Sequence, residues 1–299
     1  LRCAEYTCVS ECKEDDRQHA AGHENDEDRP IEKALARFDR ALHDMVAAHT
    51  PPDAIVLDIG AGDGDRDYPT WLKAIQGRVV GVDPSAHILA NQRLDERHQA
   101  TLEEFAPTHP QHFDIVVASL VVEHVAAPRA FLEAMHQCLK PGGSAFILTP
   151  HVYHYFGASA LIAQRLHVDE WLLRHLRDQE VLHDHHVPLQ YRMNTRHRLT
   201  RLARQAGFCY IEFRLLDEAE LYQPYVPGLL GPVPAVWSTM VHRLNITGLA
   251  GTILARLETP RRPGDQNRVA PDRDPGQATT VPKRPIQGEP APNGAAQID

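Results

Sequence analysis

Residues 54–64 read Ala-Ile-Val-Leu-Asp-Ile-Gly-Ala-Gly-Asp-Gly, and this stretch decides the fold. Its first six residues form an apolar run that is rich in β-branched side chains and too short for a helix, which predicts a buried strand. Gly60, Gly62 and Gly64 follow, ahead of a stretch that can start a helix. Because glycine has no Cβ, backbone N–H groups in such a turn can approach a ligand closely. The stretch therefore predicts a strand–turn–helix unit with a ligand at the turn.

The charges around this turn indicate which ligand it prefers. Asp58 and Asp63 make it acidic, and residues 54–64 contain no Lys or Arg that could pair with a phosphate. This composition favours a cationic or neutral polar group over a pyrophosphate. Asp83 ends the next apolar run, and a carboxylate at the tip of the second strand of such a unit accepts hydrogen bonds from ribose hydroxyls. Together these features indicate a nucleoside with an amino-acid-like tail.

Four segments occur in an order and spacing that identify a family resemblance. They are Val56–Gly64, Val80-Gly-Val-Asp83, Phe113-Asp-Ile-Val-Val117 and Leu139-Lys-Pro-Gly-Gly143. Over about residues 30–258 the chain resembles the class I S-adenosylmethionine (SAM)-dependent methyltransferases. The Tyr-Arg-Met-Asn-Thr run that ends at Thr195 resembles a bacterial subgroup associated with small molecules and glycans. The glycine spacing differs from the G-x-G-x-x-G of dinucleotide sites, which disfavours NAD.

The resemblance implies an α/β fold with a Rossmann-like doubly wound seven-stranded sheet in the order 3-2-1-4-5-7-6, the last strand antiparallel. Apolar periodicity and turn signals predict helices and strands in the following ranges. The helices are Pro30–His49, Pro69–Gln76, Ser85–Arg93, Pro128–Leu139, 157–167, 169–178, Thr195–Gln205 and 235–243, and the later strands are Phe113–Ala118, Ser144–Thr149, Cys209–Leu215 and Thr252–Glu258.

Length and composition bound the domain organisation. The chain has 299 residues and 42% hydrophobic content, enough for one full core. We expect a disordered segment at 1–29, a methyltransferase domain at 30–259 with a substrate-side insertion at about 150–194, and a disordered tail at 260–299.

The formal net charge of −9 disfavours nucleic acid as a partner. No stretch approaches the ~20 apolar residues of a membrane span, and no secretory signal is visible, so a cytoplasmic location is predicted. The oligomeric state is not predicted.

The family resemblance assigns cofactor contacts by position. The turn receives the methionine portion, with Asp58 close to its amino group; Asp83 and Pro84 lie at the ribose, residues 101–103 flank the adenine, and two residues after the fourth strand face the methyl group. The predicted cofactor-binding residues are Asp58, Gly60, Ala61, Gly62, Gly64, Asp83, Pro84, Thr101, Leu102, Glu103, Ser119 and Leu120. Thr101 stands where the family usually has an acid.

The acceptor side is predicted from histidines and tyrosines. Glu123-His124 resembles a pair that is common in the small-molecule branch, and His124 is the candidate catalytic base for a substrate hydroxyl, the alternative being a structural role. His151, Tyr153 and Tyr191 are the candidate substrate residues. The run His183-Asp-His-His186 is interpreted as a polar lid and not as a metal site, because neighbouring histidines on one short loop seldom converge on one ion.

The sequence thus predicts an enzyme that transfers a methyl group from SAM directly, in line, to a small-molecule or glycan-type acceptor. The alternative is a SAM-binding regulatory or scaffold protein without catalysis.

Overall fold

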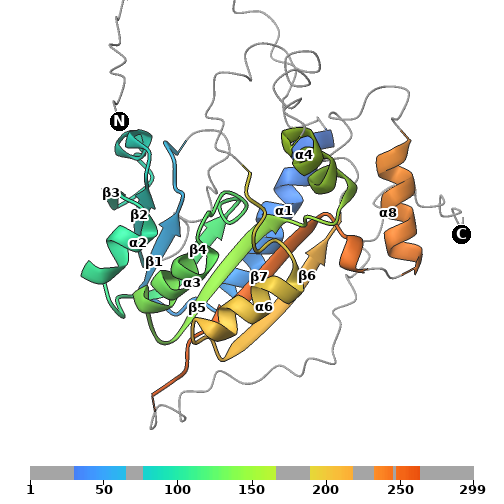
Figure 1. The fold of residues 1–299 in the computed structure, drawn as a ribbon. Coiled ribbons are helices and arrows are strands. Elements are labelled where there is room, and N and C mark those ends of the chain that lie inside the picture. The colour runs from blue at the N-terminus through green and yellow to red at the C-terminus, as the bar shows by residue number, and fades with distance from the viewer. Residues whose placement is uncertain (1–29, 65–76, 166–188, 218–231, 245–246, 263–299) are drawn as a thin grey trace, which may run out of the picture. The chain divides into compact units, whose positions relative to one another are not determined.

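A computed structural model describes residues 30–64, 77–165, 189–217, 232–244 and 247–262. The chain divides into two compact units, and the elements below lie in the unit that ends at Pro260. Their centre is a seven-stranded sheet in the order β3-β2-β1-β4-β5-β7-β6 (Figure 1). The strands are β1 (Ala54–Ile59), β2 (Gly77–Asp83), β3 (Glu96–Gln99), β4 (Phe113–Ser119), β5 (Leu139–Pro150), β6 (Tyr210–Leu216) and β7 (Thr252–Glu258).

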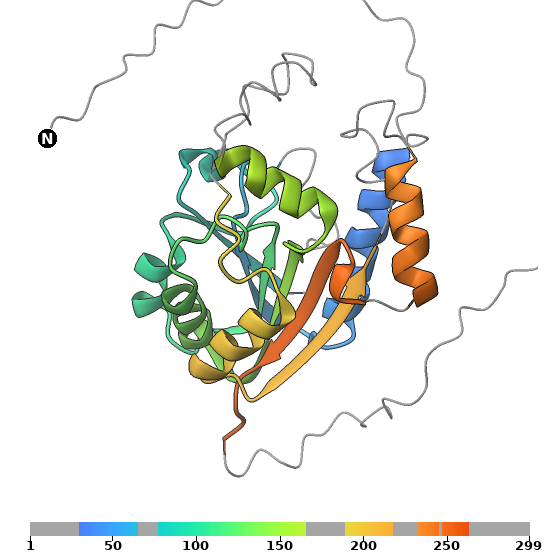
Figure 2. The ribbon, with the colours of Figure 1, turned by 45° about the vertical axis from the view of Figure 1, so that its right-hand side comes forward.

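The sheet is parallel from β3 to β5, and β7 runs antiparallel between β5 and β6 (Figure 2). The predicted fold class and strand order are therefore confirmed. The helices are α1 (Pro30–Ala47), α2 (Leu102–Phe105), α3 (Pro128–Cys138), α4 (Tyr155–Arg165), α6 (Arg196–Gln205) and α8 (Val233–Leu244), with short 3-10 helices η3 (Ala86–Ala90), η4 (Ala106–Thr108) and η8 (Thr247–Leu249).

Each face of the sheet packs against its own group of helices, because alternate residues of a strand point to opposite faces. Leu57 of β1 belongs to the apolar cluster that includes residues of α2, α3 and α6. Val56 belongs to the cluster that contains Phe38 and Leu42 of α1. Burial of both faces explains why the central parallel strands are continuous apolar runs. It also leaves the carboxyl ends of the strands as the edge where polar side chains gather.

Several predicted boundaries are wrong in ways that have local causes. The helix predicted from Ser85 to Arg93 is only the 3-10 helix η3, which Ser85 caps by accepting a hydrogen bond from His87 N at 3.3 Å. Residues 140–143 lie inside β5 as an irregularity in its pairing with β4, and Thr259 Oγ1 donates to the carbonyl of Lys140 at 2.7 Å. Cys209, expected inside the sixth strand, precedes it and is exposed. The helices predicted at Pro69–Gln76 and 169–178 lie outside the described residues.

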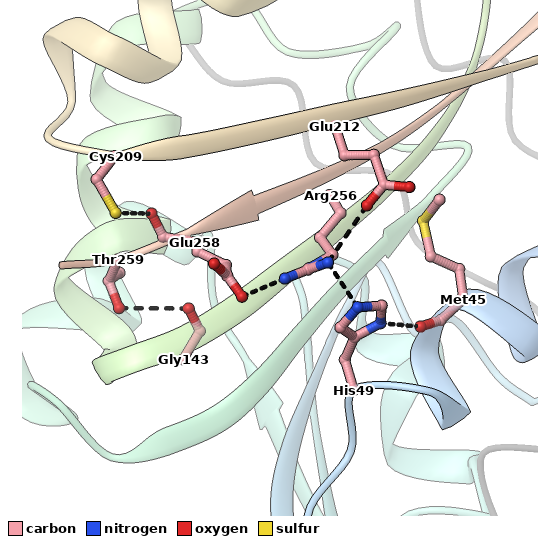
Figure 3. Close-up of polar contacts among 8 residues, drawn as sticks. All are labelled: Met45, His49, Gly143, Cys209, Glu212, Arg256, Glu258 and Thr259. Carbon is pink, nitrogen blue, oxygen red and sulfur yellow. Dashed lines mark hydrogen bonds and ion pairs between the residues drawn. The ribbon is translucent and has the colours of Figure 1, made fainter. Parts of the chain in front are cut away.

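A cluster of charged and polar groups joins the end of α1 to the antiparallel strands (Figure 3). Arg256 Nη1 lies 3.2 Å from Glu212 Oε2, and Arg256 Nη2 pairs with the carboxylate of Glu258. The same Nη1 donates to His49 Nε2 at 2.5 Å, while His49 Nδ1 lies 2.7 Å from the carbonyl of Met45. A guanidinium can only donate, so His49 accepts at Nε2 and carries its proton on Nδ1. The cluster therefore fixes the chain just before β1.

Candidate functional site

The turn after β1 has the backbone that its glycines predict. Gly60, Gly62 and Gly64 all have positive φ, at 72°, 53° and 81°. A Cβ on Gly60 would lie 2.4 Å from Val121 Cγ2, whereas a Cβ on Gly62 would meet no atom within 4 Å. Gly60 is thus required by packing against the loop after β4. Gly62 borders open space, where a ligand can approach the backbone.

Asp83 connects this turn to the end of β2. Its Oδ2 accepts a hydrogen bond from Gly62 N at 3.1 Å, and its Oδ1 accepts one from Ser85 N at 2.7 Å. The carboxylate is half-buried, and each oxygen keeps a lone pair for a further donor. Asp58 lies in the adjacent strand and is 3% exposed. The two acids predicted to bind one ligand therefore lie at the same edge of the sheet.

Asn91 supports the turn from below, and the sequence gives no local signal for this role. Its Nδ2 donates to the carbonyl oxygens of Ala61 at 3.0 Å and Gly62 at 3.3 Å, and its Oδ1 accepts from Arg93 N at 3.0 Å. The side chain is fully buried, and a Cβ on Gly64 would lie 2.4 Å from its Oδ1. Asn91 therefore holds the turn open without facing a ligand itself.

The predicted adenine residues lie at the start of α2. Thr101 and Glu104 form a capping box, in which Thr101 Oγ1 accepts from Glu104 N at 3.3 Å and Glu104 Oε2 accepts from Thr101 N at 2.9 Å. The hydrogen bonds that this carboxylate accepts from the Thr101 N–H and from the Thr101 hydroxyl, the latter also at 2.9 Å, lower the pKa of the Glu104 carboxyl. Leu102 is buried, whereas Glu103 is exposed. Glu103 is therefore the acid at this turn whose carboxylate is not part of the capping box. Pro84, after β2, is also exposed.

The first residue after β4, Leu120, adopts a strained conformation. Leu120 has a φ of 56°, which costs a non-glycine residue about 1–3 kcal/mol, and its side chain is 47% exposed. Leu120 directly follows Ser119, and its N–H donates to the carbonyl of Leu148 at 2.8 Å. His124, the candidate base, is half-buried four residues on, and its N–H donates to the carbonyl of Val121 at 3.0 Å. Glu123 beside it points into the protein and is 4% exposed.

The three predicted substrate residues are not equivalent. Tyr153 is 60% exposed, whereas Tyr191 is 5% exposed and has a φ of 45°. His151 is 2% exposed, and burial, followed by the charge of Arg196, lowers its pKa to about 4. His151 is therefore neutral at pH 7. The run at 183–186 lies outside the described residues.

His154 and Asp217 are two titratable residues with buried side chains that the sequence did not single out. His154 Nε2 lies 3.6 Å from Asp217 Oδ1, which is beyond hydrogen-bond distance. Burial, followed by the charge of His151, lowers the pKa of His154 to about 4, so this contact is not an ion pair at neutral pH. Asp217 Oδ1 instead accepts from Gly251 N at 2.9 Å.

A mostly parallel sheet with β7 inserted antiparallel, and a glycine turn facing two acids, define a Rossmann-like α/β protein of the methyltransferase type. The chain also matches the family described as "Methyltransferase domain" over residues 27–212, more than half of its length. The chain therefore belongs to this family, as its four sequence segments predict.

Curated relatives match a smaller part of the chain. The mitochondrial ubiquinone biosynthesis O-methyltransferase of Mus musculus is 39% identical over 118 residues, covering 34% of this chain and 31% of the relative. The ubiquinone biosynthesis O-methyltransferase of Caulobacter vibrioides is 37% identical over 125 residues, covering 40% of this chain and 48% of the relative. The chain thus spans less than half the length of either relative.

Solved structures agree on the fold. A SAM-dependent methyltransferase from Archaeoglobus fulgidus superposes with a TM-score of 0.50 at 16% identity, covering 75% of this chain and 94% of its own. A Haemonchus contortus phosphoethanolamine N-methyltransferase, solved with phosphomonomethylethanolamine and S-adenosylhomocysteine, also gives 0.50 at 15% identity, covering 74% and 53%. At these identities the likeness concerns the fold alone.

Proposed function

We propose that this protein transfers a methyl group from SAM to a small-molecule or glycan-type acceptor. The observation that carries the proposal is the Asp83 carboxylate, which is bonded to the glycine turn while one lone pair on each oxygen stays available. A turn that is open at Gly62 and flanked by Asp58 suits the cationic methionine end of SAM better than a phosphate.

The residues divide the work along the edge of the sheet. The turn at Gly60–Gly64 and Asp58 hold the methionine portion, Asp83 binds the ribose hydroxyls, and Glu103 and its neighbours flank the adenine. Ser119 and Leu120 border the methyl group. His151, Tyr153 and Tyr191 are proposed on the acceptor side, and of these three residues Tyr153 is the exposed one.

When bound, SAM supplies a methyl group on a sulfonium, which is already an activated leaving group. The protein's contribution is to align the acceptor with the methyl carbon and to exclude water. With SAM bound, an acceptor oxygen would bond to the methyl carbon as the carbon–sulfur bond breaks, and S-adenosylhomocysteine would leave. A hydroxyl acceptor must also lose its proton, and we assign His124 to take it.

The relatives named O-methyltransferases make an oxygen nucleophile the acceptor to test first. Among the described residues, no helix is long and apolar enough to cross a membrane. The matched relatives include a bacterial and a mitochondrial protein, and the cytoplasmic location stays a prediction. The absence of nucleic acid as a partner is also a prediction.

Calorimetric titration with SAM, S-adenosylhomocysteine and NAD tests the binding half of the proposal. We expect binding of the first two and none of NAD. Release of S-adenosylhomocysteine in the presence of phenolic, alcohol and glycan acceptors then tests transfer. SAM binding without turnover on any acceptor would favour a regulatory protein, and full turnover by His124→Ala would remove that residue as the base.

A further inference from the structure

The turn that follows β4 is fixed by hydrogen bonds to Glu123. The Glu123 carbonyl oxygen accepts from Gln190 N at 2.6 Å and from Tyr191 N at 3.0 Å. Its carboxylate Oε2 accepts from Thr149 Oγ1, at the end of β5, at 3.0 Å. The residue thus contacts two separate parts of the chain, one through its backbone and one through its side chain.

Asn194 closes these contacts into a ring. Its side-chain Nδ2 donates to Thr149 Oγ1 at 2.6 Å, and its backbone carbonyl oxygen accepts from Val152 N at 3.1 Å. Asn194 belongs to the same segment as Gln190 and Tyr191. The ring therefore runs from Glu123 through its carbonyl to this segment, then through Asn194 and Thr149 back to the Glu123 carboxylate. Asn194 and Thr149 are both fully buried.

The ring has one group whose hydrogen-bonding capacity is unused. Asn194 Oδ1 is buried and has no hydrogen-bond partner among the described residues. Rotation of the amide by half a turn would bring this oxygen to Thr149 and reverse the chain of donors. Thr149 would then donate to Asn194 and accept from a protonated Glu123.

We propose that Glu123 is a positioning residue, which holds the turn at residues 120–124 through this ring, and that the ring changes between its two donor directions when Glu123 takes up a proton. The consequence for the reaction rests on the proposed function, because this turn carries Leu120 and His124. The ring itself is a property of the folded chain and requires no ligand.

Protonation of Glu123 sets the donor direction. Burial raises the pKa of its carboxyl to about 7, while hydrogen bonds from its own backbone and from Thr149 oppose that rise. The titratable or charged residues directly next to ring members in sequence are His124, His151, Tyr153 and Arg192, and Tyr191 is a ring member itself. The charge of Arg196 acts on His151. The pKa of Glu123 is set by burial and by hydrogen bonds from its own backbone and from the Thr149 hydroxyl.

The test follows the Leu120 methyl groups by NMR between pH 5.5 and 8.5, in the full-length protein without ligand. These methyls report on the turn but do not titrate. We expect their signals to shift with a midpoint near pH 7 and to stay constant in Glu123→Gln, whose amide oxygen accepts from Thr149 at every pH. A wild-type signal that ignores pH, or the same midpoint in Glu123→Gln, would overturn the proposal.

Thr149 supplies a matched pair of variants. Thr149→Val keeps the shape but removes the hydroxyl that favours the carboxylate, so the midpoint should rise by about one pH unit. Thr149→Ser keeps the hydroxyl and should restore the original midpoint. A purely structural role would disturb both variants alike. Calorimetry with SAM separates the proposed function from the proposed role of Glu123. A protein that does not bind SAM but shows these midpoints would refute the function and still support the ring.

Discussion

Replacement of Asn91 tests whether the glycine turn after β1 is stabilised by the hydrogen bonds of the Asn91 side-chain amide. In Asn91→Asp, a carboxylate oxygen takes the place of the Nδ2 that now lies 3.0 Å and 3.3 Å from the carbonyl oxygens of Ala61 and Gly62. Two attractive contacts become repulsive, while the acceptor facing Arg93 N is kept. Asn91→Ala removes the donor without adding a charge.

The expected magnitudes follow from burial. A buried carbonyl that loses its donor costs about 1–3 kcal/mol, so Asn91→Ala should lower the free energy of unfolding by about 2–3 kcal/mol. An unpaired buried charge raises the cost to about 3–5 kcal/mol, so Asn91→Asp should be the less stable variant at pH 8. At pH 5.5 the difference should shrink, because burial favours the neutral acid, which can donate again.

Urea unfolding at both pH values measures these differences, and calorimetry measures the affinity for SAM. We expect both variants to bind SAM about 5- to 30-fold more weakly, since 1–2 kcal/mol would then be needed to order the turn. Leu89→Ala, an exposed change on the 3-10 helix η3 that Asn91 directly follows, should alter stability by less than about 0.5 kcal/mol. An Asn91→Asp variant as stable as the wild type at pH 8 would refute the assignment of Nδ2 as donor to the turn.

Four further predictions concern other parts of the structure. Asp83→Ala should weaken SAM binding by about 1–3 kcal/mol in calorimetry, and unchanged affinity would count against the ribose contact. Glu123→Gln should be more stable than the wild type at pH 8. Because the pKa of Glu123 is raised, the folded wild type takes up a proton below pH 7. The difference in free energy of unfolding between variant and wild type, measured by urea titration, should therefore be smaller by about 1 kcal/mol at pH 6 than at pH 8. Arg256→Met should lower the free energy of unfolding by about 2–4 kcal/mol, because it leaves the carboxylates of Glu212 and Glu258 without their cation. The control Arg214→Met, at a half-exposed site, should lower it by less than about 1 kcal/mol, and thermal melts measure both. The pKa of His154 is lowered in the folded protein, so the unfolded state takes up this proton first as the pH falls. The free energy of unfolding should therefore decrease below pH 6.5 by about 1.4 kcal/mol per pH unit from this group. In His154→Gln the free energy of unfolding should depend less steeply on pH in this range, and an unchanged dependence would contradict the assignment.

The fold could be predicted because its signals are local and repeated. Apolar runs that end in glycine or aspartate, or that follow Lys140-Pro-Gly-Gly143, mark the strands, and their order along the chain matches one family. The two acids at the strand ends could be placed at one edge for the same reason, since parallel strands end together. The placement of Asp58 and Asp83 at one edge therefore followed from the sequence, and so did the glycine turn, in which Gly60, Gly62 and Gly64 all have positive φ.

The residues that support the site could not be predicted, because their partners are distant in sequence. Asn91 bonds to a turn about thirty residues earlier, and Asn194 bonds to Thr149, 45 residues away. The same non-local contacts explain the wrong helix after Ser85, since a longer helix would remove Asn91 from the turn. Tyr153 and Tyr191 looked alike in sequence, yet one is exposed and the other is buried in a left-handed conformation.

The contact between Gly60 and Val121 has a consequence for how the protein can evolve. One methyl group of Val121 occupies the volume that any larger residue at position 60 would need. A larger residue at position 60 would therefore displace both the turn that is proposed to hold the methionine portion of SAM and the loop after β4 that is proposed to face the acceptor. We expect such changes to alter the Michaelis constants of both substrates together, so new acceptors are more readily accommodated by residues beyond this pair.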